Sequence, residues 1–140
     1  MSLVHATCVA LDDVGIVIRG ASGAGKSDLA LRLIDGGAAL VADDYCHVAV
    51  DKGRLLVTPP ANIAGQIEVR GYGIVKMPYR ASIAAGLVVD LKAEADIERM
   101  PEHQTCIIEG VTLPCLAVNA FAASAVAKVR IVLQNLKAAS

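Results

Sequence analysis

The chain reads Gly20-Ala21-Ser22-Gly23-Ala24-Gly25-Lys26-Ser27 at its most informative segment. This segment fits the pattern G-x-x-x-x-G-K-[ST], which is typical of a phosphate-binding loop. In such a loop successive backbone N–H groups converge on one point beside the N-terminus of a helix, where they bind a polyphosphate. We therefore expect residues 20–27 to bind a nucleotide, with Lys26 reaching the β- and γ-phosphates and the Ser27 hydroxyl coordinating Mg²⁺.

The segments that flank the loop have the periodicity that the motif requires. Residues 14–18 are a continuous apolar run, which predicts a buried strand. Residues 28–35 place apolar side chains at helical spacing and end at Gly36-Gly37. A turn at Asp12-Asp13 connects a further strand candidate, residues 3–11, to the strand before the loop. Because this turn reverses the chain, the sheet is expected to be mixed.

The rest of the chain alternates between strand candidates and turn signals. Further strands are expected at residues 38–42, 46–50, 54–58, 87–91, 106–108 and 112–118. Residues 92–103 predict a surface connection. The C-terminal segment predicts a helix with Asn119 as its N-cap and with these side chains available for packing: Phe121, Val129, Val132, Leu133 and Leu136. Together these elements predict an α/β fold, a single P-loop-containing domain over residues 1–140 with a mixed, mostly buried sheet.

The composition supports a buried sheet and argues against several kinds of partner. Hydrophobic residues make up 55% of the chain, with one Phe and no Trp, which suits a sheet covered on both faces. The net charge is −1 and Lys and Arg are not clustered, so we expect no nucleic-acid partner and no membrane partner. The longest uncharged run, residues 110–127, contains Pro114 and indicates a strand, a turn and a helix start. The chain begins without a secretory signal pattern, so we expect a cytoplasmic protein.

The four cysteines are isolated from one another in apolar stretches of the sequence: Cys8, Cys46, Cys106 and Cys115. No pair has the C-x-x-C spacing that is typical of metal sites and redox motifs. We expect buried, reduced thiols rather than a metal site or a disulfide.

Two adjacent carboxylates, Asp43 and Asp44, follow the strand expected at residues 38–42. In open α/β sheets ligands bind at the carboxyl ends of strands, so this pair is expected to face the nucleotide. Adjacent residues at a strand end point to opposite sides, which allows two roles. One carboxylate can support the metal while the other takes a proton from an attacking hydroxyl. The alternative is a solvated turn, in which Asp is also common.

Three other residues are weaker candidates when they are taken alone. His5 lies near the start of the first strand candidate, where a surface histidine is the alternative. Residues 67–75 alternate apolar and charged side chains before two glycines, so Glu68 and Arg70 are candidates for a metal ligand and a phosphate clamp. An ordinary edge strand that runs into a loop fits the same pattern.

Four features in this order and spacing resemble the catalytic domain of the HPr kinase/phosphorylase family. They are His5, the loop at 20–27, L-V-A-D-D at 40–44 and I-E-V-R-G-Y-G-I at 67–74. The resemblance extends from His5 to Val118, and it implies the fold of that family, which is related to phosphoenolpyruvate carboxykinase. It further implies the short form of the family, without the N-terminal regulatory domain of longer members.

The resemblance also implies roles for individual residues. It makes His5, Lys26, Asp44 and Arg99 catalytic candidates, with Asp44 as the acid/base. Ser27 and Glu68 become ligands of Mg²⁺, and Asp43 supports them. The signature segment contributes Glu68, Arg70, Gly71 and Gly73. Arg99 lies in Glu98-Arg99-Met100, which is similar to an Asp-Arg-Leu segment of the family; a solvated surface charge is the alternative.

The function that the resemblance implies is an ATP- and Mg²⁺-dependent serine kinase. Its partner is the phosphocarrier protein HPr, through which the family regulates the phosphotransferase system and carbon metabolism, and the family assembles as homo-oligomers, namely hexamers. One segment departs from the family: residues 116–122 lack the arginines of a P-V-R-P-G-R-like sequence, so phosphorylase activity is expected to be poor. A P-loop kinase with a small-molecule substrate and a non-catalytic ATP-sensing module are the alternatives.

Overall fold

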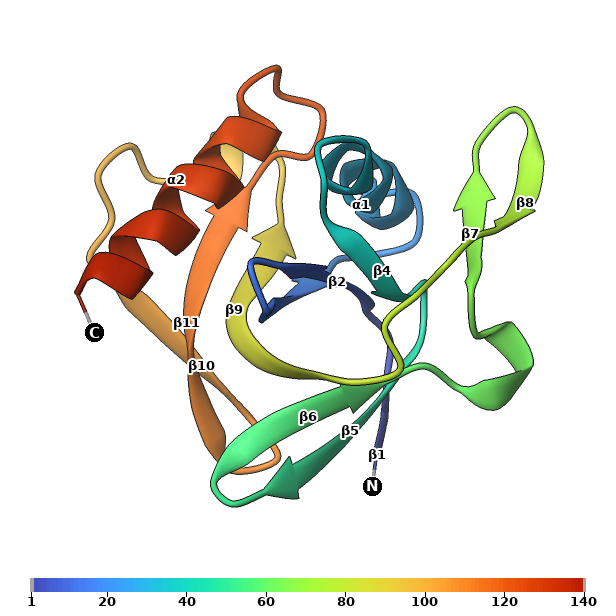
Figure 1. Ribbon diagram of the computed structural model, residues 1–140. Helices are drawn as coiled ribbons and strands as arrows, with labels where there is room; N and C mark the ends of the chain where they lie inside the picture. Colours follow the sequence, from blue (N-terminus) through green and yellow to red (C-terminus); the bar gives the residue numbers. More distant parts are fainter. Residues whose placement is uncertain (1, 140) are drawn as a thin grey trace.

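The structure is a computed structural model that describes residues 2–139 (Figure 1). The strands are β1 (Ser2–Val4), β2 (Thr7–Leu11), β3 (Val14–Arg19), β4 (Ala39–Ala42), β5 (Cys46–Asp51), β6 (Arg54–Thr58), β7 (Gln66–Val69), β8 (Gly73–Lys76), β9 (Ile83–Leu91), β10 (Gln104–Ile108) and β11 (Val111–Val118). The α-helices are α1 (Lys26–Asp35) and α2 (Ala125–Ala138), and two short 3-10 helices span Ala61–Ile63 and Glu94–Asp96.

Nine strands form one curled, mixed sheet in which β9 is the shared member. Seven of these strands are hydrogen-bonded in the order β1-β5-β6-β9-β3-β2-β4. In addition, β9 pairs with β11, and β11 pairs with β10. The first residues of β9 pair antiparallel with β6, whereas its later residues pair parallel with both β3 and β11. Figure 1 shows β9 curving between β2 and the β5–β6 hairpin as it makes this change. The predicted mixed α/β fold is confirmed.

The carboxyl ends of several strands lie at the same edge of the sheet. β3, β9 and β11 run parallel to one another, and β2 runs antiparallel to both β3 and β4. The carboxyl ends of β4, β3, β9 and β11 and the amino end of β2 therefore lie at the same edge. Loops at this edge carry the phosphate-binding segment and the Asp43-Asp44 pair, as the rule for α/β sheets predicts.

Apolar side chains cover both faces of the sheet. On one face, Leu29 and Leu33 of α1 and Val129 and Leu133 of α2 are buried in the same cluster as the sheet residues. On the other face, a second cluster joins the central strands to the β5–β6 hairpin through residues such as Val17. Because both faces are buried, the central strands are continuous apolar runs rather than alternating ones.

The structure corrects three predictions of local structure. The strand expected at 3–11 is two strands, because Ser2–Val4 pairs with β5 while Thr7–Leu11 pairs with β3 and β4. Residues 66–76 form a separate hairpin, β7–β8, rather than an edge strand of the main sheet.

The third correction concerns the C-terminal helix. It begins at Ala125, and Asn119 is not its N-cap. Asn119 instead accepts a hydrogen bond from the backbone N–H of Phe121 at 3.1 Å. Asparagine side chains offer such local bonds as an alternative to helix formation. Phe121 is therefore outside the helix, and 69% of its surface is exposed instead of packed.

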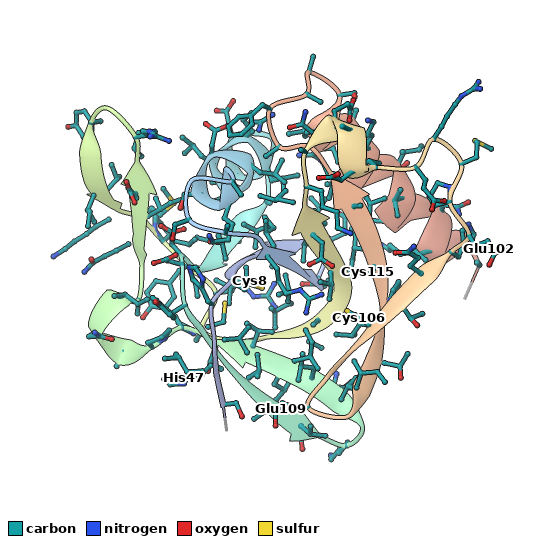
Figure 2. All side chains as sticks on the ribbon, turned by 180° about the vertical axis from the view of Figure 1, so that it is seen from behind. Cys8, His47, Glu102, Cys106, Glu109 and Cys115 are labelled. Atoms are coloured by element: carbon teal, nitrogen blue, oxygen red, sulfur yellow. The ribbon has the colours of Figure 1, made fainter. Side chains whose placement is uncertain are left out.

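All four cysteines are free, but only two of them are buried. Cys8 and Cys46 lie in the interior, whereas Cys106 and Cys115 are half-buried on the neighbouring strands β10 and β11 (Figure 2). Burial raises the pKa of the Cys46 thiol to about 12. The predicted burial holds for Cys8 and Cys46 but not for Cys106 and Cys115. Across residues 2–139, neither helix is long and apolar enough to cross a membrane.

Candidate active site

The phosphate-binding segment forms a tight loop between β3 and α1. Gly23 and Gly25 have φ values of 82° and 100°, a region in which glycine avoids the steric cost of a side chain. The N–H of Ala24 donates to the carbonyl of Ala21 at 3.0 Å, which closes the turn. The loop thus ends at the N-terminus of a ten-residue helix, where unpaired N–H groups favour an anion.

Lys26 is the first residue of α1, and its side chain turns back over the loop. Its Nζ donates to the carbonyl of Gly20 at 2.9 Å and to that of Ala21 at 3.3 Å. The residue is buried, so its positive charge is held close to the loop rather than dispersed in solvent.

Asp43 is a buried carboxylate that connects three elements of the fold. The Ser27 hydroxyl at the start of α1 donates to its Oδ1 at 2.6 Å, and the Thr7 hydroxyl of β2 donates to the same oxygen at 3.1 Å. Its Oδ2 accepts the backbone N–H of Glu68 in β7 at 2.9 Å. These donors fix the carboxylate directly beside the serine of the phosphate loop.

Asp44 has a different environment, although it is the next residue. Its side chain is 54% exposed, and its Oδ1 lies 2.8 Å from Nε2 of His5. The backbone N–H of Asp44 donates to the Thr7 hydroxyl at 3.0 Å, and its φ is 68°. The His5 ring lies 5.1 Å from the ring of Tyr45. The pair therefore presents one buried and one accessible carboxylate, as two separate roles require.

A cavity of about 260 Å³ connects these groups. Its lining comprises Ser22, Gly23 and Gly25–Asp28 of the loop and helix start, Leu31, Asp44, and Glu68, Val69 and Arg70 of the β7–β8 hairpin. The structure thus brings together most of the predicted site residues. Gly71 and Gly73 lie at the turn of the hairpin with φ values of 86° and 138°.

Arg99 is not brought to this cavity. It lies in the connection between β9 and β10 and lines a separate cavity of about 570 Å³ together with residues of β11 and α2. The catalytic role of Arg99 stays a prediction.

The oxygen donors at the site suit a hard cation that arrives with a nucleotide. Ser27 supplies a hydroxyl and Asp43 a carboxylate, and the exposed Glu68 lies on the wall of the same cavity. Within residues 2–139, no three His, Cys, Asp or Glu side chains form a cluster that could hold a metal without other ligands. Mg²⁺ is commonly held by one or two carboxylates plus substrate phosphates, and the residues present fit that pattern.

Two contributors were not predicted from the sequence. Thr7 is fully buried and bridges the side chain of Asp43 and the backbone of Asp44. The only signal for it is a hydroxyl residue at the start of an otherwise apolar strand. Arg32 of α1 donates to the carbonyl of Ala120 and so ties the loop after β11 to the helix that follows the phosphate loop.

The fold and the site define a mixed α/β protein with a phosphate-binding loop and a carboxylate pair at the same sheet edge. More particularly, the chain belongs to the family of the HPr Serine kinase C-terminal domain, which matches residues 1–133. This membership agrees with the resemblance found in the sequence motifs.

Individual relatives support the same assignment. The chain is 40% identical over 88 residues to the HPr kinase/phosphorylase of Clostridium tetani, a match that covers 63% of this chain and 28% of that protein. It is 38% identical over 97 residues to the HPr kinase/phosphorylase of a Geobacillus species, which covers 64% and 31%. The chain therefore spans about a third or less of the length of these relatives.

A solved structure has the same fold. The chain superimposes on the Hpr(Ser) kinase/phosphatase of Coxiella burnetii with a TM-score of 0.87, over 98% of this chain and 97% of that one, at 24% sequence identity. This likeness confirms the predicted architecture.

Proposed function

We propose that this protein is a serine kinase that transfers the γ-phosphoryl group of ATP to HPr. The observation that carries the proposal is the unequal carboxylate pair beside the phosphate loop. Asp43 is buried against Ser27, whereas Asp44 is exposed on the wall of the cavity. Nucleotide binding alone has no need for a second, accessible carboxylate, whereas transfer to a hydroxyl does.

The phosphate loop and Lys26 bind the polyphosphate in this proposal. The loop N–H groups and the start of α1 supply partial positive charge at fixed positions. Lys26 gives up its bonds to the carbonyls of Gly20 and Ala21 and moves to the phosphate oxygens. Because the ammonium group is already buried beside the loop, it carries little hydration to lose when it moves.

Ser27 and Asp43 hold Mg²⁺ together with the phosphates, and Glu68 is the third candidate ligand. The ion, when bound, neutralises charge on the phosphate oxygens as the transfer proceeds. The protein's own contribution is to fix both ligands in advance, since Thr7 and the backbone of Glu68 hold the Asp43 carboxylate in place.

Asp44 orients the acceptor hydroxyl and takes its proton. His5 bonds to Oδ1, so we assign Oδ2 to the substrate hydroxyl. Thr7 fixes the backbone of Asp44, and His5 fixes its side chain, so the carboxylate is positioned before substrate binds. Since Asp44 is more than half exposed, a serine on the surface of a protein can reach it. This accessibility favours HPr over a small molecule enclosed in a pocket.

We expect phosphorolysis to be weak. Ala120 and Phe121, in the loop after β11, lie against Gly25 of the phosphate loop. Residues 116–124 contain no charged side chain, although binding of inorganic phosphate beside the nucleotide site calls for cations. The loop therefore places apolar side chains beside the phosphate loop and supplies no cation that could bind inorganic phosphate.

The remaining parts of the proposal follow from family membership. Residues 1–140 act as the catalytic domain, and the protein works in the cytoplasm as a homo-oligomer, with the hexamer as the expected form. Its activity would regulate the phosphotransferase system and carbon metabolism through HPr. ATP and Mg²⁺ are its cofactors.

The test is transfer of label from γ-labelled ATP, with Mg²⁺, to purified HPr from the same organism. Wild-type protein should label HPr, and Asp44→Asn should abolish the label while ATP still binds. An HPr whose acceptor serine is replaced by alanine should remain unlabelled. Asp51→Asn removes an exposed carboxylate in the β5–β6 hairpin and should label HPr normally. Binding of ATP by the wild-type protein without any label on HPr would contradict the proposal.

A further inference from the structure

The common edge of the sheet sets the direction in which a nucleotide lies. Asp43 and Asp44 follow β4, on one side of the phosphate loop. In the proposed function, the γ-phosphoryl group that is transferred faces Asp44. The nucleoside is at the other end of the triphosphate, so it lies on the other side of the loop. On that side the edge continues with the carboxyl ends of β9 and β11.

The loop after β11 places an aromatic ring at this position. Phe121 is the only phenylalanine of the chain, and 69% of its surface is exposed. Two of its ring carbons, Cε1 and Cζ, lie 3.3 Å from the point where a side chain on Gly25 would begin. Figure 1 shows the loop between β11 and α2 on the side of α1 that faces away from the β7–β8 hairpin. The loop that carries Phe121 and the hairpin strand that carries Glu68 thus lie on different sides of α1 (Figure 1).

The loop holds the backbone of Phe121 in place before any ligand binds. Arg32 donates to the carbonyl of Ala120, and Ala120 is buried against Gly25. The side chain of Asn119 accepts the N–H of Phe121, and its backbone carbonyl accepts the N–H of Ala122 at 3.1 Å. Because the backbone is already ordered, binding to this loop loses entropy mainly from the side chain of Phe121.

The cavity at the phosphate loop offers no such surface. Among the described residues that line it, charged and small side chains predominate and no ring is present. A purine base is flat and largely apolar on its faces, and aromatic side chains bind such faces by stacking. We propose that Phe121 is the platform on which the purine base of ATP stacks. This inference rests on the proposed function, because it takes ATP as the ligand of the phosphate loop.

Nucleotide affinity with and without a base tests the inference. Dissociation constants for Mg²⁺-ATP and for Mg²⁺ with inorganic triphosphate are measured by calorimetry on the wild-type protein, Phe121→Leu and Phe121→Tyr. Because stacking of a base on an aromatic ring contributes to the binding free energy, Phe121→Leu should bind ATP about tenfold more weakly than the wild-type protein. The tyrosine variant should keep wild-type affinity, and triphosphate binding should be equal in all three. Ile107→Ala removes an apolar side chain of the same exposed fraction, 69%, near the far end of the β10–β11 hairpin and should change neither constant.

Two results would overturn the inference. Equal ATP affinity in the wild-type protein and Phe121→Leu would show that the ring makes no contact with the base. An equal loss of ATP and triphosphate affinity would show that the substitution damages the phosphate loop instead. Both results can be told apart from failure of the kinase assay. If Phe121→Leu weakens binding of ATP but not of triphosphate, in a protein that does not label HPr, then stacking on Phe121 is supported and the serine kinase is rejected.

Discussion

His5 Nε2 lies 2.8 Å from Asp44 Oδ1, although 39 positions separate the two residues in the chain. The contact exists because β2 lies between β3 and β4, so the residues before β2 meet the residues after β4 at one edge of the sheet. An imidazole beside an exposed carboxylate fixes the orientation of that carboxylate.

Loss of this imidazole should slow catalysis without weakening nucleotide binding. His5→Ala leaves Asp44 free to rotate, and misplacement of a catalytic group can cost on the order of a hundredfold in rate. Steady-state kinetics should therefore show a fall in kcat for HPr phosphorylation and an unchanged KM for ATP. His103→Ala, which alters an exposed histidine in the connection before β10, serves as the control. A rise in the KM for ATP at constant kcat would assign His5 to the nucleotide instead.

Thr7 should stabilise the fold through its hydroxyl rather than its bulk. Thr7→Val keeps the shape of the side chain but removes its hydroxyl. The backbone N–H of Asp44 then has no acceptor, and the Asp43 carboxylate loses one donor. The free energy of unfolding should fall by about 2 kcal/mol. Urea denaturation measures this loss. Thr7→Ser should restore most of it, and Thr105→Val, at an exposed position of β10, should have little effect. A stable Thr7→Val protein would show that the hydroxyl is dispensable.

The two left-handed glycines of the phosphate loop should respond unequally to alanine. At Gly23 a Cβ meets nothing within 4 Å, so Gly23→Ala bears only the backbone cost of about 1 kcal/mol. At Gly25 a Cβ would lie 2.8 Å from the Cβ of Ala120, so Gly25→Ala also displaces the loop after β11. Thermal unfolding and ATP titration should rank Gly25→Ala as the more harmful change in both respects. Equal effects would argue against the packing between these loops.

Asp90 should make the stability of the protein sensitive to acid. Burial alone would raise the pKa of Asp90, but hydrogen bonds from Arg19, at 2.7 and 2.9 Å, and from Cys115 outweigh burial and lower this pKa. A carboxyl whose pKa is lower in the folded state than in the unfolded state stabilises the protein at pH values above its unfolded-state pKa. This stabilisation is lost as the pH falls through the folded-state pKa. The difference in unfolding free energy between wild type and Asp90→Asn should be constant at neutral pH and shrink below about pH 4. A difference that grows in acid would contradict the assignment.

The local parts of the site could be predicted from sequence because they depend on neighbouring residues. The strand, loop and helix around residues 20–27 follow from glycine placement and periodicity. The position of Asp43 and Asp44 follows from the general rule for strand ends. The predicted hairpins at residues 46–58 and 106–118 were also confirmed, since turn residues interrupt their apolar runs.

The contacts between distant segments could not be predicted in the same way. The bond from Thr7 to Asp43 depends on strand order, which no local pattern specifies. Asn119 was expected to cap a helix, but its side chain closes a turn five residues before the helix cap at Ser124. The position of Arg99 relative to the site could not be predicted either, because periodicity does not determine the path of the long connection in which it lies. The roles of the site residues stay predictions until the kinetic tests are made.

The pairing of β3 with β9 has a consequence for the order in which the protein folds. The strand that feeds the phosphate loop obtains its parallel neighbour only when residues 83–91 are available, and Gly25 obtains its packing partner only with Ala120. Contacts between segments so distant in the chain form late, because closing a long loop costs entropy before any contact repays it. During synthesis on the ribosome, residues 83–91 and Ala120 must therefore have emerged before the nucleotide site can take shape.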